Sequence, residues 1–252
     1  MWYGYETNIG KSQLKPQTGT NLLKSINCKR DLNTNKFSSI FGRLNWVKHI
    51  IMDCNSNSVH QYTPDQIDKI GNTIIYLTEH IQPLYKTKLL KLLYLLDEFL
   101  VKKYGVPFLN LDYEVWQAGP VCSDIYQELN EKPNLLEDYI LLIFDESGTR
   151  VSAKRKFVDN EFSDNEISLL QFVVDKFKYT PAPELVSLTH GDSSPWYKAA
   201  QANGLLELFD AKKTNTSNCK VDLIDLVKGD TLKEQRYKDF QEYYNAVKSL
   251  KQ

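Results

Sequence analysis

The sequence predicts an α+β domain that is predominantly helical, with a central apolar helix and a short strand and hairpin element packed against other helices. Three observations support this prediction. Helix-start signals such as Thr63-Pro64 precede several stretches with helical spacing of apolar residues. Residues 86–104 carry so broad an apolar surface that it needs cover on several sides. Short alternating segments beside glycine and proline lie between the helical stretches.

Composition divides the chain near Met52. Residues 1–51 contain eight Lys or Arg and two Asp or Glu, whereas residues 52–252 are net acidic. The first part is also rich in Asn, Ser and Thr, so we predict a flexible basic extension. Two alternatives remain open: an organellar targeting peptide, or a stretch upstream of a true start at Met52. Residues 52–252 are predicted to form one helical domain that ends in an aromatic helix.

The first helices of this domain have clear boundaries. Thr63 is a suitable N-cap for a helix that extends to about Ile81. The central helix is expected from Lys86 to Tyr104, because Gly105 and the proline two residues later end it. A short strand is expected next, over residues 109–117, and residues 119–120 should end it before a helix over 121–130. Residues 138–144 and 150–154 then predict a hairpin.

The second half of the domain is predicted to be helical. Ser163 and Glu166 form a capping box that opens a helix to about residue 179. Two further helices are expected from Thr180-Pro181 and Ser194-Pro195. A second capping box, formed by Thr231 and Glu234, should open the terminal helix. One side of that helix carries Tyr237, Phe240, Tyr244 and Val247.

Motifs for catalysis, metal binding and cofactor binding are not found in the sequence. It contains no glycine-rich phosphate loop, no H-E-x-x-H and no EF-hand loop, and its four cysteines are far apart. We therefore predict no catalytic residue, no cofactor and no metal, and hence a protein that is not an enzyme. Reduced thiols and the lack of an apolar stretch of 18 residues favour a cytoplasmic protein with no membrane partner.

Three groups of residues offer the best case against this interpretation. His190, Asp192 and Ser194 lie close in sequence, but a helix end followed by the N-cap of the next helix explains them better than a catalytic triad. Cys122 is interpreted as a buried thiol rather than a nucleophile. Asp97 and Glu98 point about 100° apart on a helix, so we expect a solvated face or an internal cap rather than a paired site.

Nucleic-acid binding is not expected of the acidic domain, whose partner should be a protein. The net charge of the whole chain is −1, which provides no general attraction to phosphates. The basic residues of the first 51 positions and the run Lys154-Arg155-Lys156 keep a nucleic-acid-binding regulator as an alternative.

Three blocks of the sequence, in order, resemble the Panacea domain, also known as the SocA-like or GepA-like phage-associated domain. The first block is the helix containing Lys88, Lys91, Leu92, Leu93 and Tyr94. The second contains Lys103, Tyr104, Gly105 and Pro107, and the third contains Trp116, Gly119, Pro120 and Val121. Residues 162–166, 184–190 and 195–196 resemble the second half of the family, so the resemblance covers about residues 65–200.

The resemblance implies the antitoxin of a type II toxin–antitoxin system, which neutralises a cognate protein toxin by direct complex formation. A phage accessory protein or a proteolytic adaptor on the same scaffold remains an alternative. Because tyrosine and tryptophan are common anchors of protein interfaces, we expect partner contacts at the turn after the first strand and on the terminal helix. The candidate residues are Trp116, Gln117, Gly119, Pro120, Tyr237 and Tyr244.

Overall fold

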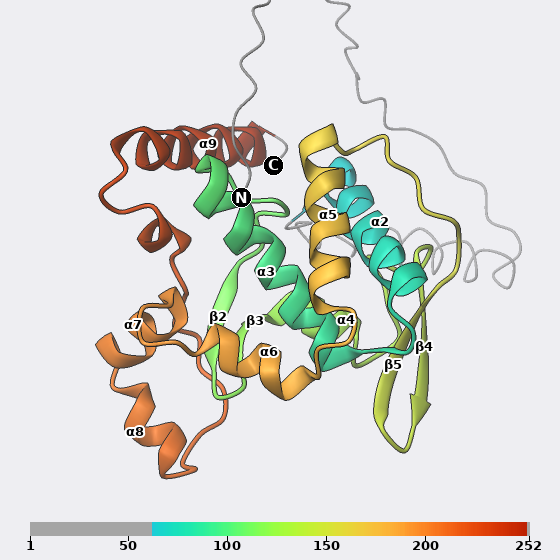
Figure 1. The fold of residues 1–252 in the computed structure, drawn as a ribbon, viewed down its shortest axis with the longest axis horizontal. Coiled ribbons are helices and arrows are strands. Elements are labelled where there is room, and N and C mark those ends of the chain that lie inside the picture. The colour runs from blue at the N-terminus through green and yellow to red at the C-terminus, as the bar shows by residue number, and fades with distance from the viewer. Residues whose placement is uncertain (1–61, 251–252) are drawn as a thin grey trace, which may run out of the picture. The chain divides into compact units, whose positions relative to one another are not determined.

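The computed structural model describes residues 62–250 (Figure 1). The predicted basic extension over residues 1–51 and the predicted domain boundary at Met52 lie outside the described residues. The elements are α2 (Pro64–His80), β1 (Leu84–Tyr85), α3 (Lys86–Tyr104), β2 (Tyr113–Trp116), β3 (Gly119–Cys122), α4 (Ser123–Glu128), β4 (Ile140–Asp145), β5 (Gly148–Ala153), α5 (Asp164–Phe177), α6 (Ala182–Thr189), α7 (Pro195–Ala202), α8 (Leu205–Asp210), the 3₁₀-helix η1 (Leu223–Leu226) and α9 (Thr231–Leu250). No helix among them is long and apolar enough to cross a membrane.

The fold is α+β and predominantly helical, as predicted, and α3 is its central helix. Helices α5, α6 and α9 and strand β3 all contact α3, and Figure 1 shows it running through the middle of this part of the chain. Leu89, Leu92, Leu93 and Leu96 are fully or almost fully buried on it. Each buried leucine contributes about 2 kcal/mol of hydrophobic stabilisation, so the predicted stripe contributes substantially to the core.

Capping groups fix where the long helices begin. The Thr63 hydroxyl accepts a hydrogen bond from the backbone N–H of Gln66 at the start of α2. The capping box of Ser163 and Glu166 is present at the start of α5. The terminal helix differs by one residue from the prediction. Asp230, not Thr231, accepts from the third backbone N–H, so Asp230 is the N-cap of α9.

The segment after β2 is a second strand, where the sequence predicted a stop and then a helix. Strands β2 and β3 form an antiparallel hairpin in which Trp116 pairs with Gly119 and Val115 with Pro120. The backbone N–H of Val115 donates to the carbonyl of Cys219, which lies on the side of β2 away from β3. The paired residues Val115 and Pro120 therefore make no hydrogen bonds to each other between β2 and β3. A proline therefore costs no ladder hydrogen bond at position 120, and the strand continues through it.

The predicted hairpin over residues 138–154 is confirmed as β4 and β5, joined by a two-residue turn. Strand β5 lies between β4 and the short β1, and α2 packs against this three-stranded sheet. Close packing depends on Gly71 of α2, because a Cβ there would lie 2.0 Å from the ring of Tyr139. The short elements β1, α8 and η1 were not predicted, since six residues or fewer give too little periodicity.

Candidate partner-binding surface

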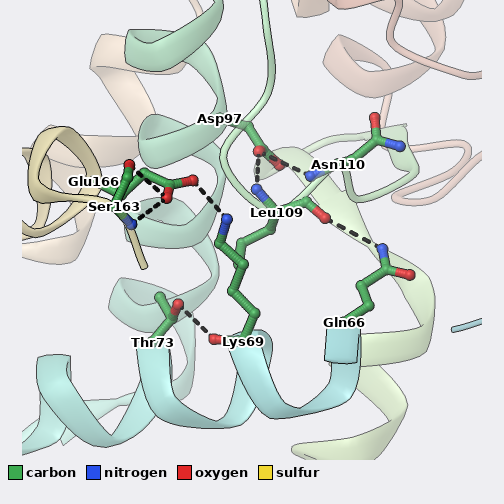
Figure 2. Close-up of polar contacts among 8 residues, drawn as sticks. All are labelled: Gln66, Lys69, Thr73, Asp97, Leu109, Asn110, Ser163 and Glu166. Carbon is green, nitrogen blue, oxygen red and sulfur yellow. Dashed lines mark hydrogen bonds and ion pairs between the residues drawn. The ribbon is translucent and has the colours of Figure 1, made fainter. Parts of the chain in front are cut away.

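Asp97 is fully buried on α3 and organises the loop between α3 and β2. One carboxylate oxygen accepts hydrogen bonds from the backbone N–H groups of Leu109 (2.6 Å) and Asn110 (3.1 Å), as Figure 2 shows. The other accepts from the N–H of Leu111 and the hydroxyl of Tyr113. Burial raises the pKa of Asp97, and these hydrogen bonds act in the opposite direction. Asp97 therefore caps the backbone N–H groups of this loop from inside the protein. Because Asp97 is buried, it does not lie on a solvated face of α3, which was the other expectation from the sequence.

This loop forms hydrogen bonds with both α2 and α9. The Leu109 carbonyl accepts a 3.2 Å hydrogen bond from the side-chain amide of Gln66 on α2 (Figure 2). The side chain of Asn110 accepts a 2.7 Å hydrogen bond from the amide of Gln241 on α9. Gln66 in turn accepts a hydrogen bond from the hydroxyl of Tyr244, also on α9. The loop is thus held by one glutamine from each helix, and Tyr244 is fixed beside it.

A cleft of about 320 Å³ lies between α2, the loop, the start of α5 and α9. Its aromatic lining comes from Phe108 of the loop and from Phe240 and Tyr244 of α9. The rings of Phe240 and Tyr244 are stacked with their centroids 6.3 Å apart, and the Lys69 ammonium lies 5.2 Å from the centroid of the Phe108 ring. Large, rigid aromatic side chains at a cleft are well suited to anchor a partner protein.

The charged side chains of the cleft make it acidic. Lys69 forms an ion pair with Glu166 on its wall (Figure 2). Burial acts to raise the pKa of Glu166, but the hydrogen bonds from Lys69 and Ser163 outweigh it, so the pKa is lowered. Asp65 and Glu161 are exposed and also line the cleft. Three carboxylates therefore face one ammonium group, which favours a positively charged side chain of a partner.

The β2–β3 turn carries four of the predicted partner-binding residues. Gln117 is exposed, and its side-chain amide donates to the carbonyl of Phe209. Trp116 is half-buried, with its ring 4.8 Å from that of Tyr126. Gly119 and Pro120 are buried, so they shape the turn instead of offering surface.

A buried lysine of α3 forms a hydrogen bond with this turn. The Lys91 ammonium is almost fully buried and donates a 2.8 Å hydrogen bond to the carbonyl of Pro120. Burial lowers the pKa of Lys91 to about 7. Only glycine fits at position 119, because a Cβ there would lie 2.7 Å from the Thr189 hydroxyl and 2.9 Å from the Lys91 ammonium. Burial, and then the charge of Lys91, lower the pKa of His190 to about 4.

The side chains that the sequence offered for a reactive centre, those of His190, Ser194 and Cys122, lie in structural surroundings instead. The His190 ring lies 3.9 Å from the Trp196 ring, and its Nε2 atom is buried with no hydrogen-bond partner among the described residues. The Ser194 hydroxyl caps α7 by accepting from the N–H of Tyr197. Burial raises the pKa of the Cys122 thiol to about 11, which disfavours the nucleophilic thiolate. In residues 62–250, no group of three His, Cys, Asp or Glu side chains is placed to hold a metal ion.

The predicted partner-binding residues lie in two separate places. The β2–β3 turn lies beside α7 and α8, whereas α9 crosses the C-terminal end of α3 (Figure 1). Tyr244 lines the cleft, and Tyr237 packs half-buried against the core. Sequence reasoning missed Gln66 and Lys69. Gln66 precedes the buried Ile70 by four residues and so shares its face of α2, which was the available signal.

This arrangement defines a predominantly helical domain with an acidic, aromatic cleft and a hairpin turn that Lys91 holds in place. Residues 89–197 match the protein family described as Antitoxin SocA-like, Panacea domain. Over this stretch the chain is therefore similar to the Panacea domain of SocA-like antitoxins. The matched stretch runs from within α3 into α7, so it includes both hairpins but neither α2 nor α9. Neither a curated protein nor a solved structure matches the chain.

Proposed function

We propose that this chain is the antitoxin of a type II toxin–antitoxin system and neutralises a cognate protein toxin in the cytoplasm by forming a complex with it. The match of residues 89–197 to the SocA-like antitoxin family is the observation that carries this proposal. Neutralisation of this kind needs contact alone. The antitoxin covers the active site of the toxin or holds the toxin in an inactive shape, and an interface of about 1,200–2,000 Å² is sufficient for a stable complex.

The acidic cleft beside α9 is the surface that we expect to hold the toxin. The rings of Phe240 and Tyr244 supply apolar area at a low cost in side-chain entropy. Asp65 and Glu161 attract a lysine or arginine of the toxin and orient it. Trp116 and Gln117, at the β2–β3 turn, are a second candidate contact outside the cleft.

The cleft combines walls of two kinds. The loop residues 106–110, together with Glu161 and Glu166, belong to the stretch that matches the family. Phe240 and Tyr244 belong to α9, which lies outside that stretch. We therefore expect the loop wall to provide a shared platform, whereas the aromatic helix selects the particular toxin.

The test is co-expression of the full chain with the product of the adjacent gene. We expect that product to stop growth when it is expressed alone, growth to resume on co-expression, and the two proteins to purify together. Phe240→Ala combined with Tyr244→Ala should weaken the complex by about tenfold or more, as loss of interface anchors does.

Tyr179→Ala is the matched control, because this tyrosine is 88% exposed and follows α5. It should leave the affinity unchanged. An adjacent gene product that is harmless alone, or that does not bind the chain, would overturn the proposed function. Equal losses in the cleft variant and the control would contradict the assignment of the cleft.

A further inference from the structure

Strand β4 (Ile140–Asp145) is the longer of the two edge strands of its sheet, and the two-residue β1 is the other. Among residues 62–250, β4 pairs with β5 on one side and with no strand on the other. The β2–β3 hairpin is different. Its β2 edge bonds to the segment around Cys219 and Val221, and the Pro120 carbonyl of β3 accepts from Lys91. Figure 1 shows the β4–β5 hairpin extending beyond the helices that cover the rest of the sheet.

The register of the hairpin shows which backbone groups face outward. The Tyr139 carbonyl accepts from the N–H of Lys154, so position 139 and every second residue after it face β5. The backbone N–H and C=O groups of Leu142 and Phe144 therefore point away from β5. They form a row of donors and acceptors with the spacing of a β ladder, and an extended chain is the partner that satisfies such a row.

The side chains of β4 give this edge no protection. Ile140–Phe144 is an uninterrupted run of apolar residues, without the lysine or proline that usually shields an edge strand. Leu141 is 48% exposed and Phe144 is 66% exposed. A soluble protein that leaves such a segment uncovered risks aggregation, which favours a partner that covers it.

A groove of about 400 Å³ runs beside the strand and identifies the kind of segment that fits. Its apolar lining includes Pro133, Leu142 and Phe144. Its charged lining consists of two acidic and two basic side chains, Glu131, Glu137, Lys132 and Lys154. Because these charges balance, the groove complements an uncharged, apolar segment, in contrast to the acidic cleft beside α9.

We propose that an extended, uncharged segment of the partner protein binds along β4 as an additional strand of this sheet, with its apolar side chains in the groove. The inference deepens the proposed function and rests on it, since the partner is the toxin. The added strand would extend the contact beyond the cleft to a second face of the antitoxin.

Hydrogen exchange of backbone amides tests the proposal directly. In the free chain, the amides of Leu142 and Phe144 should exchange at least about tenfold faster than those of Leu141 and Ile143, which bond to β5. In the purified complex with the adjacent gene product, the Leu142 and Phe144 amides should become protected by a similar factor. A complex that leaves them unprotected overturns this inference but not the proposed function. Failure to form any complex overturns both.

Two matched pairs of variants test the same edge by affinity. Leu141→Lys adds the charge that edge strands normally carry and should weaken the complex by about tenfold or more. The control Leu188→Lys, at a residue that is 53% exposed on α6, should have no effect. Phe144→Pro and Phe144→Thr both remove the ring, but only proline removes the outward N–H. Proline should therefore weaken binding roughly fivefold more than threonine, as expected for one hydrogen bond.

Light scattering of the free chain tests whether a second copy of the chain, instead of the partner protein, binds along β4. A dimer that Leu141→Lys converts to a monomer would show that a second copy occupies the edge, and would overturn the assignment to the partner protein. Circular dichroism of each variant must match that of the natural chain. A variant that unfolds is replaced by Leu141→Thr, for which we expect a smaller loss of affinity in the same direction.

Discussion

The ammonium group of Lys91 lies 2.8 Å from the carbonyl oxygen of Pro120, and this hydrogen bond ties the central helix to the second strand of the β2–β3 hairpin. The contact is made in the interior, where Lys91 is 1% exposed. Proline has no N–H, and its carbonyl points away from β2, so the strand presents an acceptor to the helix at this point. Helix α3 thus stabilises the hairpin through the buried amino group of Lys91 as well as through its leucines.

Replacing Lys91 by methionine should change how stability depends on pH. Burial lowers the pKa of Lys91 from 10.5 to about 7 in the folded state, so between these values the unfolded chain binds more protons. The free energy of unfolding should therefore rise with pH from 7 towards 10.5, by at most about 1.4 kcal/mol per pH unit from this group. Urea unfolding of both proteins at pH 7, 8 and 9 measures the difference in slope. Lys238→Met, at an exposed lysine, should retain the natural slope, and an unchanged slope in Lys91→Met would contradict the prediction.

Gly119→Ala should destabilise the domain more than a glycine with the same backbone conformation and free space around it. Gly119 has a φ of 97°, and a Cβ would collide with Thr189 and Lys91. Gly229 has a φ of 94°, and a Cβ there would meet nothing within 4 Å. We expect a loss of about 1 kcal/mol at position 229 from backbone strain alone and about 3 kcal/mol at position 119. Thermal unfolding measures the loss of stability in both variants. Equal losses would show that the Cβ at position 119 does not collide with its neighbours.

Asp97→Asn should loosen the loop that forms one wall of the cleft. The asparagine oxygen can still accept from Leu109, but its NH₂ group would face the donors of Leu111 and Tyr113. We expect a loss of about 3 kcal/mol in unfolding free energy. Asp175→Asn is the matched control and should cost less than about 1 kcal/mol, since Asp175 is exposed on α5 and accepts a hydrogen bond from the nearby Gln171. Similar losses for both variants would show that Asp97 does not organise the loop.

The sequence predicted the long helices well because their boundary signals are local. Lys86–Tyr104 has both bounds as expected, since a broad apolar stripe ends at a glycine that adopts φ 77°. Strand β3 was missed for the opposite reason. Glycine and proline at positions 119 and 120 normally stop a strand, and only the register against β2 shows that Pro120 lies where its missing N–H is not needed.

The candidate surface was less accessible to sequence reasoning because it depends on contacts far apart in the chain. Tyr244 was proposed from its place on an aromatic helix, but its neighbour in the fold is Gln66, 178 residues earlier. The separation of the β2–β3 turn from α9 is a property of the tertiary packing. Periodicity identifies the face of a helix that is buried, but it does not identify the element that covers that face.

Charge reversal at the rim of the cleft should weaken the toxin complex through lost electrostatic attraction. Asp65→Lys combined with Glu161→Lys converts the two exposed carboxylates of the lining to ammonium groups. If a basic side chain of the toxin enters the cleft, affinity should fall roughly five- to tenfold at low salt, and the difference should shrink as added salt screens the charges. Glu184→Lys combined with Glu207→Lys changes the net charge equally on α6 and α8 and should have a much smaller effect. Titration calorimetry at two ionic strengths measures both pairs. Equal weakening by both would mean that the toxin responds to the overall charge of the antitoxin and not to the cleft beside α9.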